Sequence, residues 1–193
     1  MKIKNIFFDL GNVLVYFDHT ILLNFFEINE KNNNKLKKLF IDFNCGRISA
    51  QDFYIRIKIY LKKDISFEKF KKIWSEIFEL NNEMLDFAVL MKRQDKNIFI
   101  ISNTDELHFN YIINKWKELE QFDGYILSYR VGAMKPDPVI YKYAIEKYNI
   151  IPQESLIIDD LSENIEGAKK FDFNTVLFKD NGDFKEKISK FDF

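Results

Sequence analysis

The chain is poor in the residues that form disulfides and soft-metal sites. Its 193 residues include one cysteine, Cys45, and two histidines, His19 and His108. A single thiol excludes an intrachain disulfide and a zinc site with several thiolate ligands. Two imidazoles disfavour a histidine-rich metal centre. Because a lone thiol suits a reducing compartment, we expect a cytoplasmic protein.

The chain also lacks an excess of charge of either sign and a long apolar run. It carries 29 basic and 30 acidic residues, for a formal net charge of −1. This balance removes the general attraction to polyphosphate, so we expect no nucleic-acid partner. Apolar runs are shorter than the about 18 residues of a membrane span. Asp9 interrupts the N-terminal run, so we expect no signal peptide and no membrane association.

Apolar and aromatic residues, by contrast, are abundant. Hydrophobic residues make up 47% of the chain, which includes 21 Phe, 9 Tyr and 2 Trp. This composition can bury a sizeable core and is far from that of disordered chains. At about 150 residues per domain, the length fits one domain, or one domain with a modest insertion. The aromatic content is compatible with either a monomer or a homodimer.

Short apolar runs that end abruptly in polar residues predict buried parallel strands. Four such runs cover 3–8, 97–101, 156–158 and 175–178, and a weaker one covers 125–127. The spacing between the last four runs suits crossover helices. One is expected over 138–148, with Asp137 as its N-cap and Pro138 in its first turn. Another is expected to begin near Ser162.

Residues 17–92 lack such short apolar runs that end in polar residues. They divide instead into amphipathic helical windows. The windows cover 20–28, 34–43, 50–63, 67–79 and 83–93; the third also alternates like a strand, but its longer period favours a helix. We predict an α/β protein with a Rossmann-like, doubly wound parallel sheet. Residues 1–16 and 93–193 would form this core domain, and residues 17–92 an inserted helical cap domain.

Polar residues follow the predicted strands. In a doubly wound sheet the carboxyl ends of the strands line one edge, where ligands bind. Residues far apart in the sequence can therefore converge there, namely Asp9, Ser102, Asn103, Lys135, Asp159 and Asp160. Clustered carboxylates repel one another, and a bound Mg²⁺ relieves this repulsion. A lysine beside them can offset the charge of a phosphoryl group.

Four segments in this order resemble the motifs of the haloacid dehalogenase (HAD) superfamily: 8–13 (FDLGNV), 101–104 (ISNT), 134–137 (MKPD) and 158–160 (IDD). The resemblance covers the whole chain, with 17–92 in the place of a helical cap. It is greatest to the sugar-phosphatase branch that includes α-D-glucose-1-phosphate phosphatases. The resemblance implies a Mg²⁺-dependent phosphatase acting on a small phosphometabolite, with a sugar phosphate as the first expectation.

The resemblance also implies a role for each motif residue. Asp9 would be the nucleophile and form an aspartyl-phosphate that water hydrolyses. Ser102 and Asn103 would bind a phosphoryl oxygen, and Lys135 would stabilise the aspartyl and phosphoryl charges. Mg²⁺ would be held by Asp9, the main-chain carbonyl of Gly11, Asp160 and Asp159, the last directly or through water. Asn164 would orient these groups.

One position departs from the family pattern. Most phosphatases of the superfamily carry a second Asp two residues after the nucleophile, as general acid and base, where this chain has Gly11. A positioned acid is worth about 10²–10⁴ in rate. We therefore expect a preference for leaving groups that need little protonation, such as anomeric or acyl phosphates. A substrate hydroxyl, a water or a cap residue are other possible proton sources.

Two other functions are compatible with the sequence. A dehalogenase would use the same aspartate to attack carbon, but that reaction needs no divalent metal, and the Asp159–Asp160 pair argues against it. A non-catalytic phosphometabolite-binding or regulatory protein could use the same scaffold, and Gly11 keeps this possibility. His108 would either approach the site or only pack. Arg47 and Cys45 are candidates for substrate selection if their loop faces the cleft.

Overall fold

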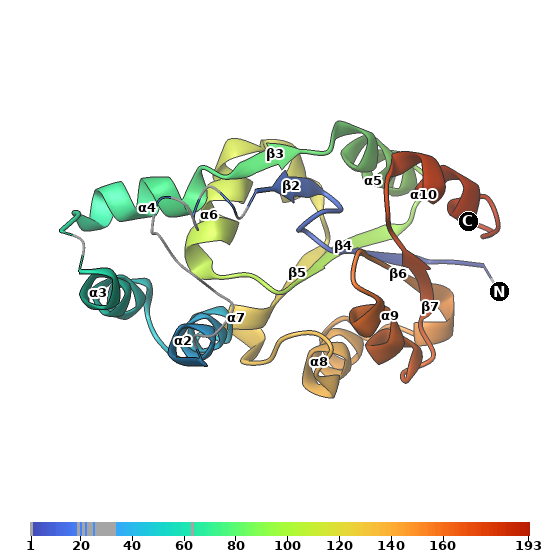
Figure 1. The fold of residues 1–193 in the computed structure, drawn as a ribbon. Helices are drawn as coiled ribbons and strands as arrows, with labels where there is room; N and C mark the ends of the chain where they lie inside the picture. The colour runs from blue at the N-terminus through green and yellow to red at the C-terminus, as the bar shows by residue number, and fades with distance from the viewer. Residues whose placement is uncertain (1, 19, 21, 23–24, 26–33, 63) are drawn as a thin grey trace.

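The computed structural model describes residues 2–18, 20, 22, 25, 34–62 and 64–193. The helix expected over 20–28 falls mainly on residues outside these. A five-stranded parallel sheet in the order β5-β4-β1-β6-β7 forms the centre of the molecule (Figure 1). Its strands confirm the five predicted runs within two residues: β1 (Asn5–Phe8), β4 (Asn97–Ser102), β5 (Gly124–Leu127), β6 (Ser155–Asp159) and β7 (Asn174–Leu177).

Helices cover both faces of this sheet, which confirms the doubly wound fold. Ile6 and Phe8 of β1 belong to an apolar cluster with α5 (Asn82–Arg93), α6 (Glu106–Lys115) and α10 (Asn181–Ile188). Phe7 points to the other face, as the period of a strand requires. It packs in a second cluster with α8 (Pro138–Tyr148) and α9 (Ser162–Lys169). Shorter elements complete the core: α7 (Ser128–Val131) and 3₁₀ turns at Lys117–Gln121 and Pro152–Glu154.

Helix starts follow the capping chemistry expected from the sequence. Asp137 accepts a hydrogen bond from the Val139 N–H at 2.9 Å, and Pro138 opens α8. The ambiguous window over 50–63 is helical, as α3 (Ala50–Leu61). The hydroxyl of Ser49 caps α3 by accepting a hydrogen bond from the Asp52 N–H at 3.1 Å. A side-chain cap supplies a partner for an N–H group that lacks one inside the helix.

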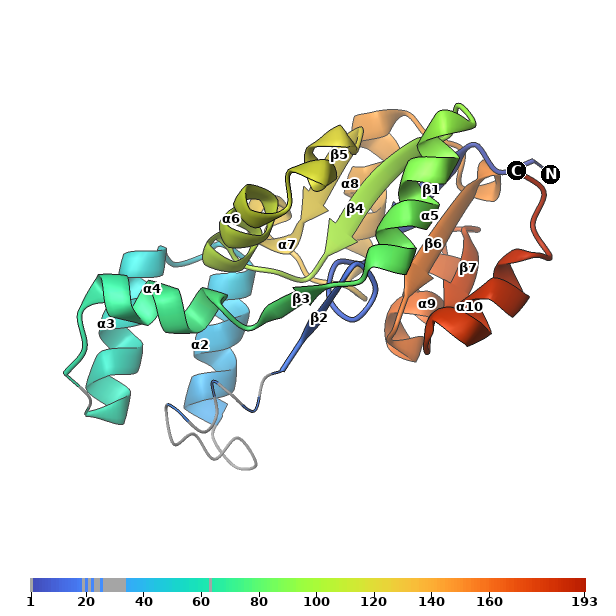
Figure 2. The ribbon, with the colours of Figure 1, turned by 90° about the horizontal axis from the view of Figure 1, so that it is seen from above.

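Between β1 and β4 the chain leaves the sheet through a two-stranded antiparallel ribbon. β2 (Val15–Phe17) pairs with β3 (Phe78–Leu80), so that Phe17 lies opposite Phe78. Beyond the ribbon lie α2 (Asn34–Asn44), α3 and α4 (Phe67–Ser75), at the end of the molecule opposite the termini (Figure 2). The expected helix over 67–79 is wrong after residue 75. Pairing with β2 overrides the helical spacing of the aromatic residues there.

The helix α5 belongs to the sheet by its contacts, although the sequence placed 83–93 with the insertion. Met84 and Ala88 pack in the same cluster as Ile98 of β4. The helices that stand apart from the sheet therefore span a shorter range than 17–92. The division into 1–16 with 93–193 and 17–92 remains a prediction. None of the described helices is long and apolar enough to cross a membrane.

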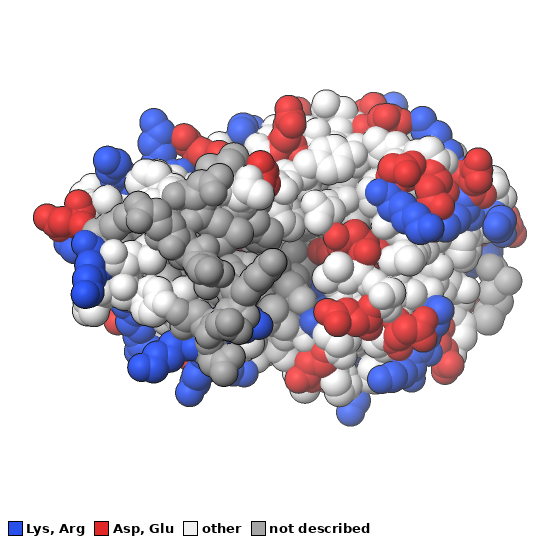
Figure 3. Space-filling model, in the orientation of Figure 1, with Lys and Arg blue, Asp and Glu red and all other residues white. Residues whose placement is uncertain are grey.

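The described surface charges agree with the balanced composition. On the face drawn in Figure 3, basic and acidic side chains are interspersed. Several exposed lysines lie within 4.0 Å of a carboxylate, such as Lys185 beside Glu83 at 2.6 Å. Mixed charge of this kind gives no broad field of one sign.

Candidate active site

The carboxyl ends of the central strands bring the predicted site residues together. Asp9 directly follows β1, Asp159 ends β6, and Lys135 lies in the loop before α8. One ligand oxygen from each of Asp9, Asp159 and Asp160 lies within 4.8 Å of the others. The chain runs outward from β1 to β5 on one side and then returns to β6 on the other. This reversal of strand order is where α/β sheets bind ligands.

Lys135 connects two of these carboxylates. Its buried Nζ lies 2.9 Å from Asp9 Oδ1 and 2.6 Å from Asp159 Oδ2. It also donates a hydrogen bond to the carbonyl of Ile101 at 2.8 Å. Burial lowers the pKa of Lys135, but the charges of Asp9 and Asp159 raise it above its ordinary value. The ammonium group is therefore held in its charged form against both carboxylates.

Asp9 is the group most affected by this environment. Burial raises the pKa of Asp9 to about 7, with Asp159 and Asp160 adding to the rise and Lys135 opposing it. Its Oδ1 accepts hydrogen bonds from Lys135 and, at 2.7 Å, from the Leu10 N–H. Three carboxylates against one ammonium leave an excess of negative charge. An all-oxygen donor set of this charge fits Mg²⁺, which prefers oxygen ligands.

The two adjacent aspartates at the end of β6, Asp159 within the strand and Asp160 directly after it, differ in their surroundings. Asp159 is fully buried, and its Oδ1 accepts hydrogen bonds from the Leu161 N–H and from Asn164 Nδ2, both at 2.9 Å. Its Oδ2 faces Lys135. Asp160 is only half-buried, and Asn12 Nδ2 donates to its Oδ2 at 2.9 Å. Asp159 is thus held at both oxygens, while Asp160 is more accessible.

The residues after β4 approach Lys135 from the other side. Asn103 Nδ2 donates to the carbonyl of Lys135 at 2.8 Å, and Asn103 Oδ1 accepts from the Lys135 N–H at 2.6 Å. Both ends of this amide therefore fix the loop that carries the lysine. Ser102, the last residue of β4, is buried and lines the adjoining cavity. The predicted contacts of Ser102 and Asn103 with a phosphoryl oxygen remain predictions.

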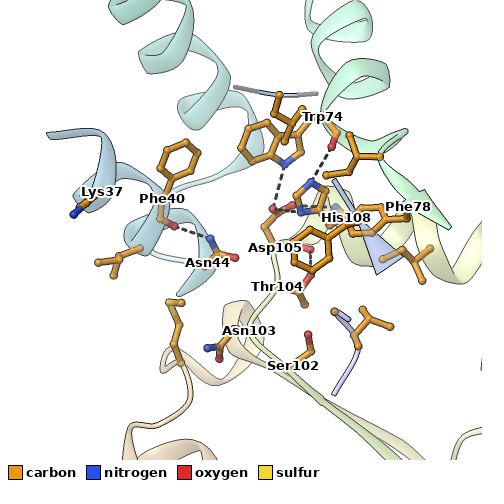
Figure 4. Close-up of a pocket in the computed structure, with 18 residues that line it drawn as sticks. Lys37, Phe40, Asn44, Trp74, Phe78, Ser102, Asn103, Thr104, Asp105 and His108 are labelled. Atoms are coloured by element: carbon orange, nitrogen blue, oxygen red, sulfur yellow. Dashed lines mark hydrogen bonds and ion pairs between the residues drawn. The ribbon is translucent and has the colours of Figure 1, made fainter. Parts of the chain in front are cut away.

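A cavity of about 450 Å³ extends from these residues toward the ribbon and α4 (Figure 4). Ser102, Asn103 and Gly11 line one end, and Phe17, Trp74 and Phe78 are among the aromatic residues that line the rest. Arg47 and Cys45 are not among the described residues that line it.

His108 lies on α6 at the wall of this cavity. Its Nδ1 is 2.9 Å from Asp105 Oδ2, and its Nε2 is 2.8 Å from the carbonyl of Trp74. The imidazole also stacks on the indole of Trp74, with ring centroids 5.1 Å apart (Figure 4). His108 therefore reaches the cavity, but both of its nitrogens are engaged in joining α6 to α4.

A family model for haloacid dehalogenase-like hydrolases matches residues 3–172. The chain belongs to this family. The resemblance expected from the four motifs is confirmed. The HAD fold also accounts for the parallel sheet with its helical insertion.

Relatives of this HAD chain include phosphatases. It is 27% identical to a D-ribitol-5-phosphate phosphatase of Bacteroides thetaiotaomicron, over 97% of each chain. A crystal structure of a HAD family enzyme from the same organism superimposes with a TM-score of 0.85 at 26% identity, covering 97% of this chain and 99% of that chain. A complex of a HAD family enzyme of B. thetaiotaomicron with magnesium and inorganic phosphate gives a TM-score of 0.81 at 25% identity, covering 93% of this chain and 96% of that chain.

Several residues at the site were not singled out from the sequence. Asn12 holds Asp160, and the hydroxyl of Tyr141 donates to the carbonyl of Asn164 at 2.8 Å. Phe17 lies against Gly11. Asn12 has a signal in the sequence, since asparagine tolerates the left-handed conformation that it adopts at φ 56°. The contact of Tyr141 with Asn164 joins residues far apart in the chain, and that of Phe17 with Gly11 crosses a turn, so neither leaves a local pattern.

Proposed function

We propose that the chain is a Mg²⁺-dependent phosphatase that hydrolyses a small phosphometabolite through an aspartyl-phosphate. The observation that carries this proposal is the cluster in which Lys135 bridges Asp9 and Asp159, with Asp160 beside them. A phosphatase among its relatives and a relative crystallised with magnesium and phosphate support the proposal. A phosphorylated-carbohydrate phosphatase of Thermotoga maritima among its relatives favours a sugar phosphate.

The hydrogen bonds of Asp9 indicate which of its oxygens attacks. Oδ1 is held by the Leu10 N–H and by Lys135, so we assign Oδ2 as the nucleophile. Lys135 lowers the cost of bringing a phosphate dianion to a carboxylate, because it neutralises charge on both. Ser102 would donate its hydroxyl to a phosphoryl oxygen. Asn103 would keep Lys135 in place.

Asp9, Asp160 and the Gly11 carbonyl would hold the magnesium ion. Asp159 would act through water, because both of its oxygens are already engaged. When bound, Mg²⁺ supplies the positive charge that offsets repulsion between the phosphate and the carboxylates. The buried amide oxygen of Asn164 has no hydrogen-bond partner in the structure. Since its amide nitrogen binds Asp159, this oxygen is suited to an ordered water at the edge of the same cluster.

The alternatives differ from this proposal in what they release and what they need. A dehalogenase would release halide from a 2-haloacid without Mg²⁺. A regulatory protein would bind a phosphometabolite and turn over none. Neither explains why three carboxylates gather in one cluster with a lysine between two of them. The cytoplasmic location and the monomeric or homodimeric state remain predictions.

The test is Mg²⁺-dependent release of phosphate from a broad panel of phosphometabolites. We expect release that is abolished by a chelator and lowered by about 10³ or more in Asp9→Asn, because the amide is not a nucleophile. Asp86→Asn is the matched control, since Asp86 is exposed on α5, away from the site. Turnover that persists in Asp9→Asn contradicts the proposed mechanism. Halide release without metal, or binding without turnover, supports one of the alternatives.

A further inference from the structure

The space beside Gly11 is filled by Phe17. A Cβ atom placed on Gly11 would lie 2.6 Å from Phe17 Cε1 and 3.4 Å from Cδ1. Carbon atoms attract at about 3.5–4.0 Å and repel strongly at the shorter of these distances. A side chain at position 11 is therefore incompatible with the ring in its present place. Gly11 therefore lacks the family's usual acidic side chain, and the apolar ring of Phe17 occupies the space that such a side chain would need.

The Phe17 ring is held in this place by the ribbon. Phe17 lies opposite Phe78 in the pairing of β2 with β3, and their ring centroids are 6.1 Å apart. Both rings line the cavity that begins at Ser102 and Gly11. Edge-to-face packing of this kind adds about 0.5–1.5 kcal/mol to the burial of the rings. The ring is thus held in the cavity wall beside Gly11.

Several described polar side chains of the cavity are engaged elsewhere. Asp105 accepts hydrogen bonds from His108 and, at 3.1 Å, from the indole N–H of Trp74. Asn44 Nδ2 donates to the carbonyl of Phe40 at 2.9 Å. Lys37 is exposed on α2 and lies away from Ser102 in Figure 4. None of these groups, within the described part of the wall, stands ready to protonate an oxygen that leaves beside Gly11.

We propose that Phe17 is a specificity-determining residue that closes the general-acid position and restricts the enzyme to phosphate compounds with a weakly basic leaving oxygen. Anomeric, acyl and aryl phosphates share this chemistry. The proposal rests on the phosphatase function and narrows its substrate class. Phosphate esters of primary alcohols, in contrast, release a strongly basic alkoxide, whose oxygen needs a proton in the transition state.

The step balances without an acid from the protein. Asp9 Oδ2 forms a bond to phosphorus while the bond from phosphorus to the leaving oxygen breaks, and the electron pair stays on that oxygen. The resulting oxyanion of a sugar or phenol takes a proton from solvent water and leaves hydroxide, which takes up a proton of the released phosphate, whereas a carboxylate stays ionised. Water then attacks phosphorus, the bond to Asp9 breaks, and the carboxylate is regenerated with release of dihydrogen phosphate.

The first measurement compares leaving groups on the wild-type protein with Mg²⁺. Glucose 1-phosphate and glucose 6-phosphate present one sugar with two ester oxygens of different basicity, and phenyl and benzyl phosphate form an aromatic pair. We expect kcat/KM to be higher by about 10² or more for the less basic oxygen of each pair. Acetyl phosphate tests whether acyl phosphates are substrates, as the proposal expects. Equal or faster hydrolysis of glucose 6-phosphate and benzyl phosphate overturns the proposal.

The second measurement places an acid at position 11 with and without room for it. In Gly11→Asp alone we expect the ratio of kcat/KM between the two members of each substrate pair to stay as in wild type, because the new side chain clashes with Phe17. In Gly11→Asp with Phe17→Ala we expect the ratios to fall at least about tenfold, since the acid can then protonate basic oxygens. The matched control is Gly11→Asp with Tyr16→Ala, because Tyr16 is 40% exposed and is the strand neighbour of Phe17.

The two outcomes separate this inference from the proposed function. If no phosphate compound is hydrolysed, or if Asp9→Asn remains active, the phosphatase function itself is wrong. If phosphate is released but the ratios are near one, or if the Phe17→Ala double variant keeps the wild-type ratios, only the role of Phe17 is wrong. Wild-type ratios near one overturn the proposal even where the double variant does not fold.

Discussion

The two walls of the site are built on different physical principles. At the ends of the strands, Lys135, Asp9 and Asp159 form a charged wall, in which buried opposite charges hold one another in place. Across the cavity, Trp74 and Phe17 belong to an aromatic wall, in which they are fixed mainly by packing against other aromatic rings. A buried charge cluster gives little net stability, because desolvation offsets the attraction. Buried aromatic rings stabilise strongly. The first wall therefore serves chemistry at phosphorus, and the second serves stability and the choice of leaving group.

The charged wall gives the largest expected effect. In Lys135→Met, Asp9 and Asp159 lose the ammonium that lies between them, and a bound phosphate would lose the same positive charge. We expect kcat/KM for phosphate release to fall by about 10³. The free energy of unfolding should fall by about 3 kcal/mol in urea titrations, because two carboxylates remain buried without a counter-charge.

Lys142→Met is the control for the loss of a lysine, since Lys142 is exposed on α8. Both quantities should stay near their wild-type values in this variant. If Lys135→Met retains activity within tenfold of wild type, the charge between Asp9 and Asp159 does not serve the reaction, and the contrast between the walls is lost.

The aromatic wall should respond in stability instead of chemistry. Phe53 is fully buried, stacks on Phe43 with centroids 4.3 Å apart, and meets Trp74 at 5.0 Å. We expect Phe53→Ala to lower the free energy of unfolding by about 3–5 kcal/mol. In hydrogen exchange, amides of α3 and α4 should lose protection before those of β1 and β6, because the cluster belongs to the insertion.

Ile59→Ala on the same helix is the matched variant, since Ile59 is 71% exposed. Its effect on stability should stay within about 0.5 kcal/mol. Equal loss of protection in β1 and in α3 in the Phe53→Ala protein would show that both walls unfold as one unit.

The same contrast explains what could be predicted from the sequence. The sheet and its catalytic edge could be predicted because each strand is a local apolar run followed by a polar residue. The apolar runs next to Asp9 and Ser102 therefore predict that both residues lie at the carboxyl ends of strands. The start of α8 was predictable for the same reason, since Asp137 and Pro138 cap it from adjacent positions.

The aromatic wall could not be predicted in this way. The ribbon forms because Phe17 meets Phe78 across a long insertion, and no local period records that pairing. The helical spacing of Trp74 and Phe78 even favoured the wrong element. Likewise, Gly11 could be recognised as a missing acid, but the ring that fills its space comes from the other side of a turn. Contacts that depend on tertiary pairing override local propensity.

The smallest expected effect concerns the cost of the charged wall. Burial raises the pKa of Asp9 to about 7 from its ordinary value of 3.8. Between these values the folded chain holds a proton that the unfolded chain has lost, so stability falls as pH rises through this window. In Asp9→Asn this contribution is absent. Between about pH 5 and about pH 8, the variant should therefore lose about 1–3 kcal/mol less stability than wild type, measured by urea unfolding with a chelator.

Two further measurements show whether this difference comes from the cluster. Asp86→Asn should follow the wild-type pH dependence, because its carboxylate is exposed and distant. Saturating Mg²⁺ should reduce the pH dependence of wild type toward that of Asp9→Asn, since a nearby cation favours the charged carboxylate and ligand binding stabilises the folded state. Parallel curves for wild type and Asp9→Asn without metal would mean that the charged wall imposes no cost on folding, and the two walls would then differ only in chemistry.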